Sequence, residues 1–141
     1  MRMFAFLAFG IMLLSLYYFP KENNSAIEMQ AMNFLMYRDS VRNHVFKLDK
    51  IIPGVISDKD IAFPTGFMNK KWKAQIEKNI LYIYGNATQQ EINQVKKQTL
   101  YSHSVGQKKN GLFYPHYTKP PTILPNFIKE GDLVSIMEIV E

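Results

Sequence analysis

The sequence contains no cysteine among its 141 residues. Without thiols the chain has no disulfide, no cysteine nucleophile and no zinc–thiolate site. This absence is compatible with either side of a bacterial inner membrane, so it does not decide the compartment.

Motifs of the common catalytic and cofactor sites are also missing. There is no phosphate-binding G-x-x-x-x-G-K-[ST], no dinucleotide fingerprint, no H-E-x-x-H and no G-x-S-x-G. His44, His103 and His116 have no metal-ligand spacing with one another or with a carboxylate. Ser102 and Ser104 flank His103, but neighbours in a strand point to opposite faces. We therefore expect no enzymatic activity, no metal, no cofactor and no small-molecule substrate.

What the sequence does have is a long apolar run at its N-terminus. Residues 3–19 carry no charge, and Pro20 and Lys21 end the run. At about 1.5 Å per helical residue it reaches roughly 25 Å, slightly less than the roughly 30 Å of a hydrocarbon core. We expect residues 1–20 to be a transmembrane anchor. Its apolar residues are Phe4, Phe6, Leu7, Phe9, Ile11, Leu13, Leu14, Leu16, Tyr17 and Tyr18.

The end of this run favours an anchor that is retained over a signal that is cleaved. A cleavage site needs small residues, whereas the residues before Pro20 are bulky. Tyr17 and Tyr18 suit the aromatic belt at a membrane interface. A short basic tail before the run favours a cytoplasmic N-terminus and a periplasmic domain. A cleaved signal remains the alternative.

The rest of the chain has the composition of one folded domain. The sequence is 47% hydrophobic and 13% aromatic, which favours a packed core over disorder. The net charge of +5 comes mostly from dispersed lysines. Such a surface suits anionic headgroups or an acidic partner, although solvated lysines are common on any protein.

Local patterns predict an α+β domain over residues 25–141, joined to the anchor by a linker at residues 21–24. Ser25 and Glu28 form a capping-box pattern, and apolar residues recur at helical spacing as far as Phe46. This predicts an amphipathic helix over residues 25–46. Thr88 and Glu91 form a second capping box, which predicts a short helix over residues 88–98.

Strand patterns fill most of the remainder and predict a small, mostly antiparallel sheet. The segment ILYIYGN at residues 80–86 is apolar on both faces, so we expect a central strand. Asn110 and Gly111 indicate the turn of a hairpin. A proline-rich extended crossing follows, and residues 133–140 alternate as a final strand.

A tryptophan surrounded by lysines is a candidate partner contact. Trp72 lies among Lys70, Lys71 and Lys73, so it is a candidate for docking into a partner's pocket. The alternative is a core tryptophan ringed by solvated lysines, because a lone tryptophan is usually well buried. We expect no nucleic acid binding.

The order of several weak motifs, taken together, resembles the small PilM family of the thin (type IV) pilus operons of conjugative plasmids. This family is distinct from the actin-like protein of the same name. The motifs are Phe34-Leu35-x-Tyr37-Arg38, Phe63-Pro64-x-Gly66, LYIYGN, Ser104-Val105-Gly106, Leu124-Pro125 and a terminal strand after Gly131.

The resemblance implies a single-pass inner-membrane protein with a periplasmic domain and a structural role in pilus assembly. It brings no catalytic residues. Its implied partners are other pilus biogenesis proteins or pilins, and self-association is left open. Contact would run through the anchor, the helical stripe of residues 25–46 or an exposed sheet edge.

Two alternatives from other classes remain. A minor pilin is disfavoured because processing after Gly10 would place Ser15, not glutamate, at the fifth mature position. The second alternative is an envelope enzyme or binding protein that is released by signal cleavage.

Overall fold

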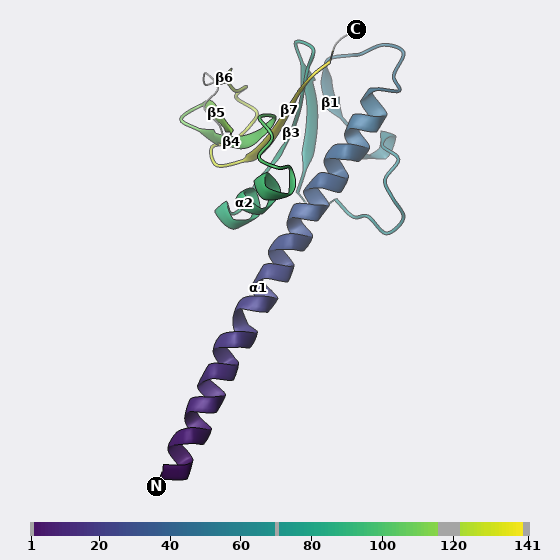
Figure 1. Ribbon diagram of the computed structural model, residues 1–141. Coiled ribbons are helices and arrows are strands. Elements are labelled where there is room, and N and C mark those ends of the chain that lie inside the picture. The colour runs from purple at the N-terminus through teal and green to yellow at the C-terminus, as the bar shows by residue number, and fades with distance from the viewer. Residues whose placement is uncertain (1, 70, 116–121, 140–141) are drawn as a thin grey trace.

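A computed structural model describes residues 2–69, 71–115 and 122–139, with side chains from Asn24 onward. One long helix carries a seven-stranded sheet and a short second helix (Figure 1). The helices are α1 (Arg2–Val45) and α2 (Gln89–Gln98), with a 3₁₀ turn η1 (Asp58–Asp60). The strands are β1 (Gly54–Ile56), β2 (Lys73–Glu77), β3 (Ile80–Gly85), β4 (Val105–Lys109), β5 (Leu112–Pro115), β6 (Thr122–Ile123) and β7 (Leu133–Glu138). This architecture confirms the predicted α+β class.

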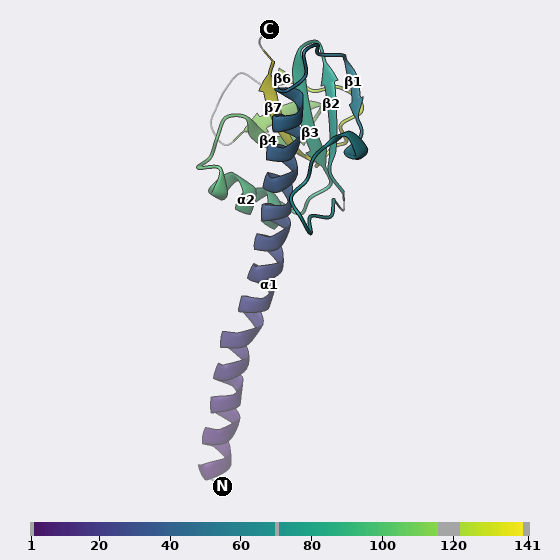
Figure 2. The same cartoon turned by 90° about the vertical axis from the view of Figure 1, so that its right-hand side faces the viewer.

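Helix α1 is continuous through the segment predicted to be a linker. Residues 21–24 lie inside the helix, and Ser25 is not its N-cap. Extending an existing helix adds one hydrogen bond per ordered residue, whereas starting a second helix requires a new and costly nucleus. Figures 1 and 2 show the N-terminal half of α1 projecting from the domain as a stalk.

The C-terminal half of α1 forms the core with one face of the sheet. Phe34, Tyr37 and Val41 are fully buried, and they belong to the same cluster as Leu81 and Ile83 of β3. The apolar stripe predicted for this helix is therefore buried in the protein's own core. It is not available as a docking face.

The opposite face of the sheet has a smaller core of its own. Tyr82 and Tyr84 of β3 pack with Phe113 of β5 and Val134 of β7. Leu124, in the segment after β6, is part of the same cluster. Both faces of β3 are thus buried, as its sequence predicts.

The strands follow the order β1-β2-β3-β7-β4-β5-β6, and all neighbours are antiparallel. The last strand, β7, is central because it pairs with both β3 and β4. The two edges are short, since β1 has three residues and β6 has two. Short edge strands offer little backbone for a partner strand to pair with.

Two local predictions are confirmed, and one strand was not foreseen. Helix α2 begins with the capping box of Thr88 and Glu91 and buries Ile92 and Val95. Strands β4 and β5 form the predicted hairpin, with positive φ angles at its turn. Strand β2 was not predicted from the sequence, although it alternates exposed or half-buried polar residues with buried Ala74 and Ile76.

The side chains of the predicted membrane anchor, residues 1–20, lie outside those that the structure describes. In the part with described side chains, no helix combines the length and the apolar character needed to cross a bilayer. The proline-rich crossing at residues 116–121 also lies outside the described residues.

Candidate functional site

Trp72, the centre of the predicted partner contact, is a core residue. It is 3% exposed, and its ring meets Phe34 edge to face at a centroid distance of 4.9 Å. Its Nε1 donates a hydrogen bond of 2.8 Å to Asn33 Oδ1 on α1. The structure thus corresponds to the second interpretation of this motif, in which lysines surround a buried ring.

The lysines beside Trp72 differ from one another. Lys71 Nζ forms an ion pair of 3.0 Å with Glu91 Oε2 and lies 4.8 Å from the centroid of the Trp72 ring. Lys73 is exposed on β2. Lys70 lies outside the described residues. The described members of the motif, Lys71, Trp72 and Lys73, therefore do not form an exposed aromatic–cationic patch.

Polar contacts attach the loop between β1 and β2 to α1. The hydroxyl of Tyr37 donates to Asp58 Oδ1 at 3.0 Å, and Asn69 Nδ2 donates to Asp58 Oδ2 at 2.6 Å. Burial, followed by the Asp58 contact, raises the pKa of Tyr37 above its usual value. Asn33 Nδ2 donates to the carbonyl of Met68 at 3.1 Å. These bonds give the loop a fixed position beside the helix.

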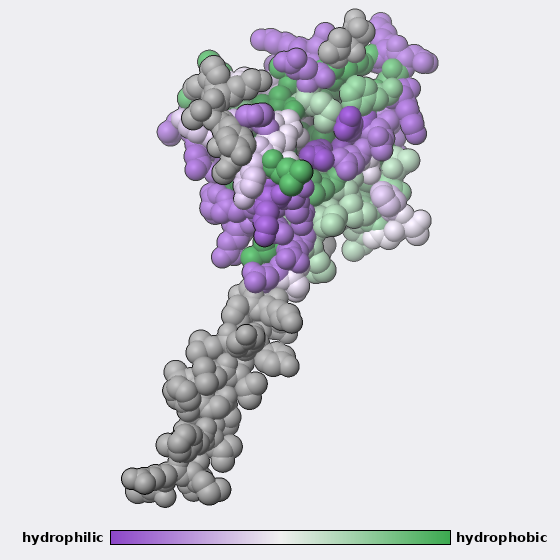
Figure 3. Space-filling view, in the orientation of Figure 1, coloured by the Kyte–Doolittle hydropathy of each residue, from purple (hydrophilic) through white to green (hydrophobic). Residues whose placement is uncertain are grey.

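The fixed loop and α1 together present methionines to solvent. We call Met29, Met32, Met36 and Met68 the methionine surface. Met29, Met32 and Met68 are 68%, 52% and 70% exposed. In Figure 3 pale green, apolar atoms gather over the loop between β1 and β2, beside the helix. Unbranched, polarisable methionine side chains adapt to varied apolar partners.

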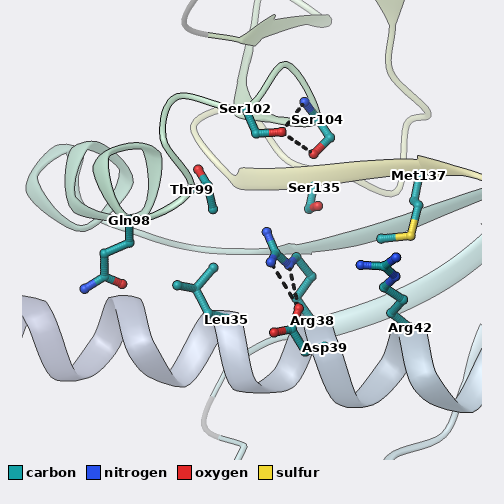
Figure 4. A pocket seen from close by; sticks show the side chains of 10 residues that line it. All are labelled: Leu35, Arg38, Asp39, Arg42, Gln98, Thr99, Ser102, Ser104, Ser135 and Met137. Atoms are coloured by element: carbon teal, nitrogen blue, oxygen red, sulfur yellow. Dashed lines mark hydrogen bonds and ion pairs between the residues drawn. The ribbon is translucent and has the colours of Figure 1, made fainter.

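A polar pocket of about 320 Å³ lies between α1, the end of α2 and β7 (Figure 4). We call it the arginine pocket. In Figure 4 Arg38 and Arg42 rise from α1, Ser135 and Met137 come from β7, and Ser102 and Ser104 come from the loop after α2. Its remaining lining residues are Leu35, Asp39, Gln98 and Thr99.

The two arginines of this pocket have different surroundings. Arg38 forms an ion pair of 3.0 Å with Asp39, and the side chain of Arg38 is only 20% exposed. Arg42 is exposed, and its guanidinium lies 5.6 Å from the centroid of the Phe46 ring. Among the described residues Arg42 has no carboxylate partner. Its charge is therefore available to a ligand.

The hydroxyls opposite the arginines complete a set of hydrogen-bonding groups. Ser102 Oγ and Ser104 Oγ are 2.9 Å apart and hydrogen-bonded. Ser135 Oγ and Gln98 Oε1 are buried and have no hydrogen-bond partner in the described part of the chain. Guanidinium and hydroxyl groups together are the kinds of donor that proteins use for oxyanions. No group of three potential metal ligands occurs among the described residues.

Sequence reasoning missed this pocket because its parts are far apart in the chain. Arg38 and Arg42 are four residues apart, a spacing that places them on one helix face, and this was the only signal available. Nothing in the sequence indicates that Ser135 of the last strand lies opposite them.

Comparisons with known proteins show the family and the fold. The family model described as PilM matches residues 10–136. The fold is similar to the crystal structure of a protein designated PilM from Escherichia coli B7A, with a TM-score of 0.65 and 13% identity. That likeness covers 82% of this chain and 94% of the other, and at this identity it shows a shared fold. No curated protein matches the sequence.

Proposed function

This chain belongs to the PilM family, which implies involvement in pilus biogenesis, and we propose that it is an inner-membrane-anchored structural component of a conjugative type IV (thin) pilus apparatus. Its apolar N-terminus spans the membrane once, and its α+β domain lies in the periplasm. It has no catalytic role. Its partners are other pilus biogenesis proteins or pilins.

The observation that carries this proposal is the continuity of α1. The apolar run of residues 3–19 and the core-forming residues Phe34, Tyr37 and Val41 belong to one helix. A helix of 44 residues is roughly 66 Å long at about 1.5 Å per residue. An anchor made from its first half would therefore hold the domain at a set distance from the bilayer.

The methionine surface supports contact with a membrane-protein partner. It lies on the part of α1 nearest the stalk and on the adjoining loop. Large apolar side chains exposed together are typical of interaction surfaces. A partner helix that emerges from the same membrane would run beside α1 at this level. This surface replaces the buried stripe as the proposed helical contact.

Replacement of residues 1–20 by a cleavable secretion signal tests the anchor. We expect a folded, soluble periplasmic domain and loss of pilus assembly. The matched control replaces the same residues with an unrelated transmembrane helix of equal length, which should restore membrane association. A strain with the secreted domain and normal pili would contradict the proposal.

The state of the N-terminus separates this proposal from the minor-pilin and secreted-protein alternatives. Mass spectrometry of the membrane fraction should recover a protein that still begins at Met1. Processing after Gly10 would support a pilin, and recovery of a soluble form without its apolar run would support a secreted protein.

A further inference from the structure

Two polar atoms in the arginine pocket are buried without a partner inside the chain. Ser135 is 1% exposed, and its Oγ has no hydrogen-bond partner among the described residues. The same is true of Gln98 Oε1. Leaving such a group unpaired costs about 1–3 kcal/mol. Buried polar groups nearly always have a hydrogen-bond partner in native proteins, and a bound polar ligand would supply one here.

The charge of the pocket is positive and small. Arg38 and Arg42 contribute two positive charges, and Asp39 contributes one negative charge through its ion pair with Arg38. One net positive charge remains, and it is located at Arg42. A ligand with a single negative charge would balance it. A phosphate dianion would leave one excess negative charge, and the Asp39 carboxylate would repel it more strongly than it repels a monoanion.

We propose that the arginine pocket binds a carboxylate of a partner polypeptide. The planar guanidinium of Arg42 matches the two oxygens of a carboxylate, and this geometry permits paired hydrogen bonds. Ser135 supplies a hydroxyl donor from the opposite wall. The amide of Gln98 can rotate to present its NH₂ group where its oxygen is now placed.

The position of the pocket along α1 excludes the phosphates of the anchoring bilayer as ligands. Arg38 lies roughly 27 Å beyond Pro20 at about 1.5 Å per helical residue, on the same unbroken helix. The exclusion of bilayer phosphates and the choice of a polypeptide ligand both rest on the proposed anchor and assembly function. The binding of a carboxylate does not depend on either.

The test uses full-length protein in detergent micelles with ¹⁵N-labelled arginine. The Nε–Hε signal of Arg42 is followed by NMR during titration. N-acetylglycine represents a chain terminus, and N-acetylglutamic acid α-amide represents an acidic side chain. N-acetylglycinamide is the neutral control, and inorganic phosphate tests the alternative anion.

We expect a saturable shift of the Arg42 signal with one or both carboxylate probes. The probe that binds more tightly identifies whether the partner's carboxylate is a chain terminus or an acidic side chain. The neutral amide should give no shift, and phosphate should bind about tenfold more weakly, a difference of about 1.4 kcal/mol. Equal or tighter binding of phosphate would overturn the assignment to a carboxylate. Absence of saturation by either carboxylate probe would overturn the site.

Matched variants separate the pocket from general charge effects. Arg42→Gln should abolish saturable binding, monitored by the Nε–Hε signal of Arg38. Lys73→Gln removes the same charge from an exposed position on β2 and should leave the affinity unchanged. Asp39→Asn should strengthen phosphate binding by removing the repelling carboxylate. Unchanged affinity in Arg42→Gln would overturn the proposal, whatever the result of the piliation assays.

Discussion

Trp72 and Asn33 are 39 positions apart in the chain, and a hydrogen bond of 2.8 Å from Trp72 Nε1 to Asn33 Oδ1 joins them. Asn33 also donates from Nδ2 to the carbonyl of Met68. One amide on α1 therefore holds both the residue before β2 and the loop that carries the methionine surface. The position of that surface depends on this contact.

Replacement of Asn33 by alanine should lower the free energy of unfolding by about 2 kcal/mol, because Trp72 Nε1 would be left buried and unpaired. The change can be measured by urea denaturation of the full-length protein in detergent. Trp72 is the single tryptophan, so its fluorescence reports this site alone. We expect its emission to shift to longer wavelength.

Asn93→Ala is the matched control for that experiment. Asn93 is exposed on α2, and the hydrogen bond found for its side chain is to Gln89 one turn away. Its replacement should change the free energy of unfolding by less than about 0.5 kcal/mol. Similar values for the two variants would show that the Asn33 contact adds nothing to stability.

Gly106 in β4 has no room for a side chain. A β-carbon there would lie 2.7 Å from Phe113 Cε2 and 2.8 Å from the carbonyl carbon of Tyr114. Because β4 is hydrogen-bonded between β5 and β7, the backbone cannot move away on either side. We expect Gly106→Ala to lower the free energy of unfolding by about 3 kcal/mol. Lys109 is exposed on the same strand, so Lys109→Ala should have little effect on stability. Urea denaturation of both variants checks this. Equal denaturation midpoints for Gly106→Ala and Lys109→Ala would contradict the prediction.

Removal of the Ser135 hydroxyl should not destabilise the protein. Since Ser135 Oγ is buried without a partner in the described residues, Ser135→Ala should leave the free energy of unfolding unchanged or raise it by up to about 1 kcal/mol. Ser102→Ala makes the same chemical change but removes the bond to Ser104, and it should cost about 1 kcal/mol. Greater destabilisation by Ser135→Ala than by Ser102→Ala, measured by thermal unfolding, would reveal an internal partner for Ser135.

Alkaline pH should destabilise the fold through its buried tyrosines. Burial raises the pKa of Tyr37, Tyr82 and Tyr84 in the folded state. Above the ordinary tyrosine pKa of 10.0, the unfolded chain loses these protons first, so stability falls as pH rises. Burial lowers the pKa of Lys96, which acts in the opposite direction but involves a single group.

Urea denaturation carried out at a series of pH values between about 9 and 12 would show this decline as a falling denaturation midpoint. Tyr37→Phe should make the decline shallower, because phenylalanine has no proton to lose. The variant should also be less stable near neutral pH by about 1 kcal/mol, since the hydrogen bond to Asp58 is lost. A pH profile unchanged in Tyr37→Phe would show that Tyr37 is not a source of the alkaline sensitivity.

Features that depend on residues close together in the chain were predictable from the sequence. The Thr88–Glu91 capping box is satisfied within a single turn of α2, so the residues that define it also complete it. The Asn110-Gly111 turn is similar, because both residues adopt the positive φ that their types tolerate. A short run that is apolar on both faces identified β3, and alternation of residue types identified β7.

Other features were missed because neighbouring elements override local signals. The capping pattern of Ser25 and Glu28 is present in the sequence, but α1 continues through it. The segment Lys73–Glu77 follows a cluster of lysines and has only two apolar positions, which is a weak strand signal. Pairing with both β1 and β3 makes it a strand.

The family, the α+β class and the helices and strands whose signals lie within a few residues followed from the order of the amino acids alone. The tertiary structure decided whether Trp72 was a surface contact or a core residue, and it brought Arg38 and Arg42 opposite Ser135. The physical reason is that burial and ligand geometry depend on which distant segments pack together. A local pattern of residue types specifies how a segment folds, but it does not specify what that segment will meet.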